Sequence, residues 1–132
     1  MIVLGIAALH GLNFAADWIQ QRWFHGLWLE DQRMNSSIGA HLDLVGTLVL
    51  GLSAGIGEEI TMRGALQPKL GILLTSMLFA SLHVQYSWFG MLVILLLGML
   101  LGGIRSRTNT TVVMIVHTIY DIMAVMSIDK PT

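Results

Sequence analysis

The sequence is poor in charge and contains no cysteine. Only 11% of its 132 residues are charged, against about 25% in a typical soluble domain. The absence of cysteine excludes disulfides and thiolate metal ligands, and it says nothing about the redox compartment. Seven Lys and Arg against eight Asp and Glu give a net charge of −1, so no basic excess favours a nucleic-acid partner.

Apolar residues make up 55% of the chain, and the mean hydropathy is +0.72. This composition predicts an integral, multi-pass membrane protein whose surroundings are membrane lipids. A segment in lipid must satisfy its own backbone hydrogen bonds, and no alternating barrel pattern is visible. We therefore expect an all-α fold, a polytopic bundle of four to five transmembrane helices. The length suits a single domain, residues 1–132.

Five apolar segments are separated by polar stretches. Residues 1–18 begin apolar but then carry polar side chains, which leaves open whether they form a full span. Residues 19–40 mix Trp with charges, as a segment at headgroup level does, although a solvated loop with a short helix fits nearly as well. Pro68 is expected to end the next segment. That segment and the three after it, which form the expected catalytic core over about 41–128, are residues 41–67, 70–86, 88–104 and 111–128.

The order of these segments predicts a topology. The 35 apolar residues of 70–104 are too long for one span of about 20 residues, so a break is expected at 83–87. If the spans alternate, the turns at 63–69 and 105–107 lie on one face. That face carries more Lys and Arg than the other, and the positive-inside rule then places it in the cytoplasm. With the compact size, this favours a prokaryotic plasma membrane.

The stretch Gly57-Glu58-Glu59-Ile60-Thr61-Met62-Arg63-Gly64 sets two carboxylates and an arginine among apolar residues. Ionisable groups in such surroundings are costly unless they are paired or face water, so they indicate a functional site. Glu59 and Arg63 are four residues apart in the favourable order, which predicts an ion pair. Glu58 points about 100° away and is expected to face a cavity.

Two later segments carry unusual polar residues at a similar depth. Counted from the same face at about 1.5 Å per residue, Glu58 lies at about 15 Å and His83 at about 20 Å. His117 and Asp121, which share a helix face, lie at about 14 and 20 Å. Taken alone, the two glutamates fit a pair that snorkels to an interface, His83 fits a structural residue at a helix end, and His117 with Asp121 fits a packing hydrogen bond. Their common layer favours one site built from three segments.

Three motifs, Glu58-Glu59-x-x-x-Arg63, Phe79-x-x-x-His83 and His117-x-x-x-Asp121, resemble in order those of the CPBP family. These are the CAAX-prenyl-endopeptidase and bacteriocin-processing proteins, also called Abi proteins. The resemblance covers about residues 45–126. It implies an α-helical intramembrane endopeptidase, of a metalloprotease or a glutamate type. The implied substrate is a peptide or lipidated peptide, cut in CAAX processing, bacteriocin maturation or self-immunity.

The resemblance also implies roles for the motif residues. Glu58 and His83 would activate the attacking water, while His117 and Asp121 would stabilise the oxyanion. The Glu59–Arg63 pair would hold the charge balance of the site. These roles agree with the chemistry, because hydrolysis needs a base for the water and donors for the developing oxyanion.

The sequence departs from the family at Asp121, where Asn is usual. An ionised Asp only accepts hydrogen bonds, so it would orient His117 or join a metal shell instead of donating to an oxyanion. This leaves a zinc site open as an alternative to a metal-free enzyme, with Glu58, His83 and His117 as ligands. No HExxH is present, which excludes a thermolysin-like helix. The chain is also short for the family, so outer helices are expected to be missing.

Two other classes of function stay open. A non-catalytic membrane protein that binds a toxin or signal peptide, such as an immunity factor, would need the same membrane fold. A proton or ion pathway is the second, because buried Glu and His residues also form relays. The arginine partner and the single compact layer favour a reaction site over a pathway.

Overall fold

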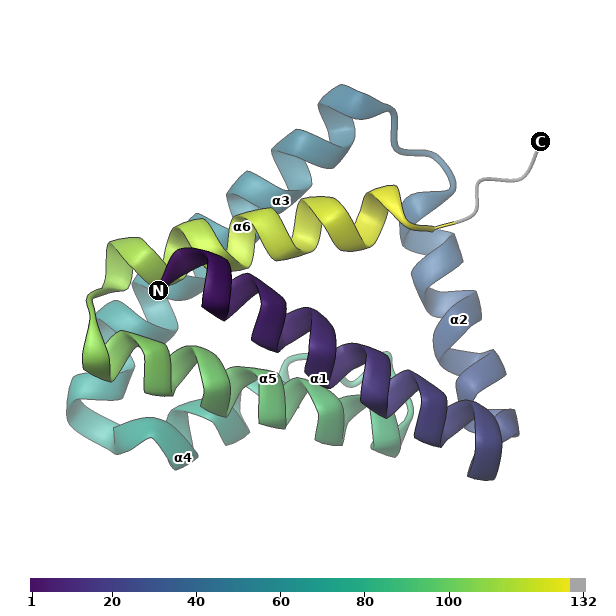
Figure 1. Cartoon of the computed structure of the whole chain (residues 1–132), viewed down its shortest axis with the longest axis horizontal. Coiled ribbons are helices and arrows are strands. Elements are labelled where there is room, and N and C mark those ends of the chain that lie inside the picture. The colour runs from purple at the N-terminus through teal and green to yellow at the C-terminus, as the bar shows by residue number, and fades with distance from the viewer. Residues whose placement is uncertain (129–132) are drawn as a thin grey trace.

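The computed structural model describes residues 1–128, and these fold into helices joined by short turns (Figure 1). Within that range no strand is formed, so the expected all-α fold is confirmed. In chain order the helices are α1 (Ile2–Trp23), α2 (His25–Gly39), α3 (Leu44–Glu59), the π-helix η1 (Ile60–Leu66), α4 (Gln67–Ser81), α5 (Trp88–Arg107) and α6 (Thr110–Met126).

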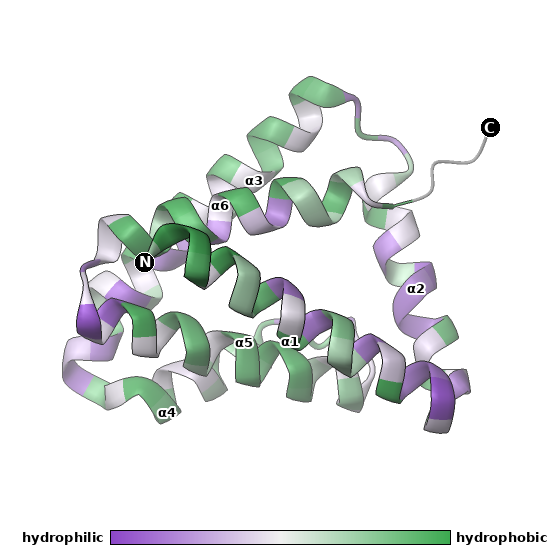
Figure 2. Ribbon diagram, viewed as in Figure 1, coloured by the Kyte–Doolittle hydropathy of each residue, from purple (hydrophilic) through white to green (hydrophobic). Residues whose placement is uncertain are grey.

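The helices have the length and the exterior of a membrane bundle. Three helical stretches of the described residues are long and apolar enough to cross a bilayer: Ile2–Trp23, Leu44–Ser81 and Trp88–Arg107. The apolar α6 is shorter, at 17 residues. Many large apolar side chains face outward, as lipid contact requires, whereas hydrophilic residues gather on α2 and at the turn between α5 and α6 (Figure 2). α1 has the length and hydropathy of a membrane span, which favours a full span for residues 1–18.

The expected end of a helix at Pro68 is wrong. Pro68 is the second residue of α4, which follows η1 without a gap, so the chain stays helical through it. The break comes three residues later at Gly71, whose φ of 78° lies in the left-handed region that glycine adopts without steric cost. After Gly71 the remaining turns of α4 pack antiparallel on α5. Ile72 lies against Gly102, and Ser76 lies against Gly98.

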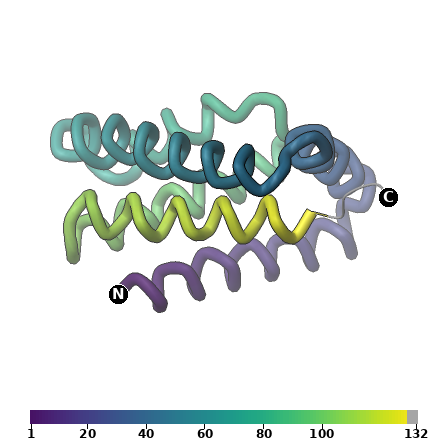
Figure 3. The backbone as a smooth tube through the Cα atoms, turned by 90° about the horizontal axis from the view of Figure 1, so that it is seen from above, coloured from purple at the N-terminus to yellow at the C-terminus, as the bar shows by residue number. Residues whose placement is uncertain are grey.

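The turns of the bundle divide between its two ends. The α3–α4 connection and the α5–α6 turn lie at one end, on the left of Figures 1 and 3. The α1–α2 connection and the α4–α5 loop lie at the other. This is the arrangement that alternating spans require, as the segment order predicted.

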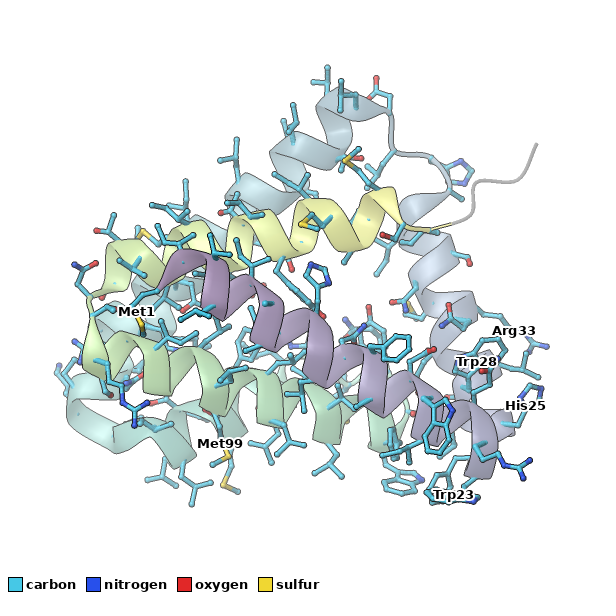
Figure 4. The ribbon with its side chains drawn as sticks, viewed as in Figure 1. Met1, Trp23, His25, Trp28, Arg33 and Met99 are labelled. Atoms are coloured by element: carbon cyan, nitrogen blue, oxygen red, sulfur yellow. The ribbon has the colours of Figure 1, made fainter. Side chains whose placement is uncertain are left out.

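The expected loop or interfacial segment at residues 19–40 is divided between two helices. Residues 19–23 complete α1, and residues 25–39 form α2, which runs across the end of the bundle. Trp23, His25, Trp28 and Arg33 lie together at this end, far from Met1 (Figure 4). Aromatic and charged side chains therefore do gather here, but on regular helices.

α6 is the central helix, because it packs against both sides of the fold. On one side it shares a small apolar core with α1 and α5, formed by Leu9, Leu97, Leu101, Ile104, Val113 and Val116. On the other side it lies close along α3. A Cβ atom at Gly55 would collide with the side chain and backbone of Thr118, and one at Gly51 would lie 2.5 Å from Ile122 Cγ1. The two glycines therefore permit the approach that brings the end of α3 beside His117.

Candidate active site

The imidazole of His117 is held by a buried carboxylate. His117 Nδ1 lies 2.8 Å from Glu59 Oε1, and the Glu59 side chain is fully buried. We assign the Nδ1–H of His117 as the donor of this hydrogen bond and the Glu59 carboxylate oxygen as its acceptor. The ring is thereby fixed with Nε2 on its opposite side. The sequence analysis assigned Glu59 only to the arginine and missed this bond.

Two further carboxylates face the other nitrogen of the same ring. His117 Nε2 lies 3.4 Å from Asp121 Oδ2 and 3.9 Å from Glu58 Oε2. The side chain of Glu58 is 36% exposed and that of Asp121 is 20% exposed, whereas Glu59 is closed off. Glu58 and Glu59 were expected to have different neighbours, but both contact His117, at opposite nitrogens, and only Glu59 also pairs with Arg63. His117 thus separates one buried carboxylate from two accessible ones.

Arg63 supports the buried side of the site. Its Nε lies 3.5 Å from Glu59 Oε2, so the expected pairing of these residues is confirmed. Its Nη2 donates to the carbonyl of Gly98 at 3.0 Å. The guanidinium also lies over the ring of Phe79, 5.2 Å from the centroid. Because Arg63 is fully buried, these contacts and the negative charge of Glu59 are what make its burial tolerable.

A π-helix follows the two glutamates directly. η1 spans Ile60–Leu66, where the sequence was expected to continue as an ordinary α-helix. π-Helical segments are rare and are frequently found at functional sites. The wider turn changes the direction of the residues that follow, and both Glu59 and Arg63 point into the protein interior here. No feature of the one-dimensional pattern signalled this turn.

His83 lies just beyond the end of α4 and joins the site through Phe79. Its Nδ1 is 2.9 Å from the Phe79 carbonyl oxygen, which can only accept, so Nδ1 donates and Nε2 is left unprotonated in the neutral ring. The Phe79 ring centroid lies 4.9 Å from that of His83 and 6.1 Å from that of His117. His83 is also near enough to Asp121 to interact with its charge. The Phe79 ring is therefore in contact with both histidines.

The site residues thus come from three parts of the chain and lie around one ring and its aromatic neighbour. Around His117 the structure brings together Glu58, Glu59 and Asp121, with Arg63 behind Glu59. Two buried hydroxyl groups of α4, those of Thr75 and Ser76, were not singled out by the sequence analysis. Each residue is 1% exposed, and neither hydroxyl has a hydrogen-bond partner among residues 1–128. A Thr-Ser pair in the middle of an apolar segment was the available signal.

The predicted zinc ligands do not converge in this arrangement. Among residues 1–128, no group of three or more His, Asp or Glu side chains is placed to hold a metal ion. The Nδ1 atoms of His83 and His117 are already occupied by the Phe79 carbonyl and by Glu59, so only the Nε2 atoms could serve as ligands. The zinc set stays a prediction, and no reaction step below is derived through a metal.

Residues 39–123, well over half of the chain, match the family described as type II CAAX prenyl endopeptidase Rce1-like. The chain belongs to this family. The matched range contains all six predicted site residues and begins at the end of α2. The resemblance inferred from the three motifs is thereby confirmed at the level of the family. The chain is accordingly a membrane protein, in agreement with its apolar helices.

A curated relative of this Rce1-like chain is YpbD of Bacillus subtilis (strain 168), whose printed name is that of an uncharacterized protein. The two are 30% identical over 109 residues, which cover 80% of this chain and 58% of YpbD. The chain therefore spans little more than half the length of that relative. No solved structure matches the chain.

Proposed function

We propose that this chain is an intramembrane endopeptidase that hydrolyses a peptide bond with a water activated by Glu58 and His83. The observation that carries the proposal is the placement of His117. Glu59 contacts Nδ1 of its ring, and Nε2 on the other side lies near Glu58 and Asp121. Membership in a family of endopeptidases supports the reaction class.

Glu58 has the properties of a base that a water can reach. It is the most exposed of the three carboxylates around His117, and the ion pair of Arg63 is made with Glu59 instead. His83 offers a second acceptor, because its Nδ1 donates to a carbonyl and its Nε2 keeps a lone pair. A positioned base of this kind contributes about 10²- to 10⁴-fold to a hydrolysis rate. We assign both residues to the attacking water.

In the proposed step the water oxygen bonds to the peptide carbonyl carbon while Glu58 takes one water proton. The oxyanion that forms is stabilised by His117, which donates from Nε2 when the ring is protonated. Collapse breaks the C–N bond, and the proton on Glu58 passes to the leaving amine. Atoms and charges balance without a co-reactant other than water.

Asp121 takes a different role from the one that an amide would have. Its carboxylate lies 3.4 Å from His117 Nε2 and stabilises the protonated ring, but when ionised it does not donate to the oxyanion. Arg63 pairs with Glu59, the carboxylate that orients His117, and balances its negative charge. The site then has one donor, His117, flanked by carboxylates with separate tasks.

The substrate is proposed to be a peptide or lipidated peptide that enters from the lipid phase. The printed family description favours a prenylated peptide with a CAAX end. The site is proposed to lie in a prokaryotic plasma membrane, with the α3–α4 and α5–α6 turns in the cytoplasm. Peptide maturation and self-immunity are the settings that fit such a membrane.

The test uses purified protein in liposomes with two probes, a farnesylated CAAX peptide and an unmodified hydrophobic peptide. Mass spectrometry identifies the products. We expect wild-type cleavage of at least one probe, and loss of cleavage in Glu58→Gln and His83→Ala. The matched control is Glu30→Gln, which alters an exposed carboxylate on α2.

The choice of probes also separates the remaining alternatives. Cleavage of the farnesylated peptide alone would assign the CAAX class, and cleavage of both would favour a broader peptide substrate. Saturable binding without any cleavage by the wild-type protein would contradict the proposal and favour a non-catalytic binding protein.

A further inference from the structure

The loop between α4 and α5, residues 82–87, carries His83 and is fixed at its far end by a buried carboxylate. The Ser87 backbone N–H donates to Asp31 Oδ1 at 2.7 Å, and the Ser87 hydroxyl donates to Asp31 Oδ2 at 2.7 Å. Asp31 is 6% exposed and Ser87 is 5% exposed. Asp31 belongs to α2, so these bonds tie that helix to the loop.

The same carboxylate is bound by a third donor from another helix. Gln20 Nε2 of α1 donates to Asp31 Oδ2 at 2.6 Å. Hydrogen bonds to an ionised acceptor are about twice as strong as neutral ones. The Ser87 hydroxyl in turn accepts from the Gly90 N–H at 3.1 Å and caps α5. Asp31 therefore joins α1, α2 and the start of α5 at one point.

A second contact lies one helical turn along α2. The Tyr86 hydroxyl donates to Asn35 Oδ1 at 2.9 Å. Burial and, to a smaller extent, the charge of Asp31 raise the pKa of Tyr86, so its hydroxyl keeps the proton that it donates. Asp31 and Asn35 are four residues apart and share a face of α2. That face therefore contacts two consecutive loop residues.

The loop is short, and its backbone hydrogen bonds link the residues that contact α2 to His83. The Tyr86 N–H donates to the His83 carbonyl at 3.1 Å, and the His83 N–H donates to the Ala80 carbonyl at 3.0 Å. Backbone hydrogen bonds therefore connect the α2 contacts to His83 and then to the end of α4. A shift at Tyr86 or Ser87 must move the backbone of His83.

We propose that Asp31 and Asn35 of α2 are positioning residues for His83. They fix the 82–87 loop so that the unprotonated Nε2 of His83 stays at the site. Both residues precede the range that matches the family, so α2 contributes to the site from outside that range. The role assigned to His83 in this inference rests on the proposed function, whereas the control of the loop does not.

Because the chain contains no cysteine, the loop can be labelled at a single introduced thiol. We would place a nitroxide at Val84→Cys, which is 73% exposed in the loop, and as a control at Leu73→Cys, which is 55% exposed on α4. Electron paramagnetic resonance then reports the mobility of each label in liposomes. We expect Asp31→Ala to increase the label mobility at position 84 and to leave that at position 73 unchanged.

Activity gives the second readout, with Glu30→Ala as the matched control on the same helix. A misplacement of about 1 Å can cost about 100-fold in rate, so we expect kcat of Asp31→Ala to fall by tenfold or more with little change in KM. Asp31→Asn retains an acceptor for the Ser87 N–H and should restore part of kcat. Glu30→Ala should match the wild type in both readouts.

The two readouts separate this inference from the proposed function. Unchanged label mobility at position 84 in folded Asp31→Ala would overturn the inference, whatever the activity. Increased mobility without any measurable peptidase in the wild type would support control of the loop and contradict the proposed function. If Asp31→Ala does not fold, Asn35→Ala removes only the partly buried bond to Tyr86, and it must then raise the mobility at position 84.

Discussion

Glu59 and His117 are joined by a hydrogen bond of 2.8 Å between Oε1 and Nδ1, although they are 58 positions apart in the chain. The bond fixes which nitrogen of His117 faces the accessible carboxylates. It also connects the His117 ring to Arg63, whose Nε lies 3.5 Å from the second oxygen of Glu59. The account of the site depends on this bond more than on any other contact.

Removing Glu59 should destabilise the fold. Glu59→Ala removes the ion-pair partner of the fully buried Arg63, and breaking a buried pair in this way costs about 3–5 kcal/mol. The measurement is the free energy of unfolding in detergent micelles. Glu58→Ala is the control, since its side chain is partly exposed and its loss should cost less than about 1 kcal/mol. Equal stabilities of the two variants would refute the role given to Glu59.

The close contact between α3 and α6 predicts that alanine is destabilising at one of two nearby glycines and tolerated at the other. Gly55→Ala places a methyl group against Thr118 and should separate the helices, at a cost of about 1–3 kcal/mol and with loss of activity. Gly57→Ala meets no atom within 4 Å and should be tolerated. Thermal unfolding and peptide cleavage by both variants check this. If Gly57→Ala is as harmful as Gly55→Ala, the close approach of the helices is not the reason.

Asp121→Asn tests how this chain departs from the family pattern. An amide can donate to an oxyanion, which an ionised carboxylate cannot do, so the variant should keep activity within about tenfold of the wild type. Asp121→Ala supplies neither a charge nor a donor and should lose more. The measurement is kcat/KM for each variant. An Asn variant as inactive as the Ala variant would mean that the negative charge beside His117 is indispensable.

Chelation should leave the reaction intact, because the mechanism proposed for Glu58 and His83 uses no metal. The protein would be dialysed against a strong chelator, its metal content verified by mass spectrometry, and its cleavage rate compared with that of untreated protein. Loss of activity on chelation that zinc restores would contradict this mechanism and support the ligand set Glu58, His83 and His117.

The sequence was informative where the contacts are local. Glu59 and Arg63 are four residues apart, so their pairing followed from helical spacing alone, and the depth argument placed His117 in the same layer. The bond between Glu59 and His117 could not be derived, because it depends on how α3 and α6 pack. The spacing of Gly51 and Gly55 indicates only that a close approach is possible.

Two local features were also missed, for physical reasons. Proline is a strong sign of a helix end, yet here the chain stays helical through Pro68, and the actual break at Gly71 depends on a conformation that many glycines do not adopt. Asp31 lies in a charged stretch of the sequence, so nothing in its surroundings indicated burial. Its role depends on Ser87, which is 56 positions away.

The most direct test of the central claim is a double-mutant comparison of Glu58→Gln and His83→Ala in the liposome cleavage assay. If the two residues activate one water together, each single variant loses nearly all activity and the double variant is hardly worse, because groups that act as a unit are not additive. That is the result we expect. Wild-type rates in either folded single variant, or independent effects that multiply in the double variant, would contradict the proposed mechanism.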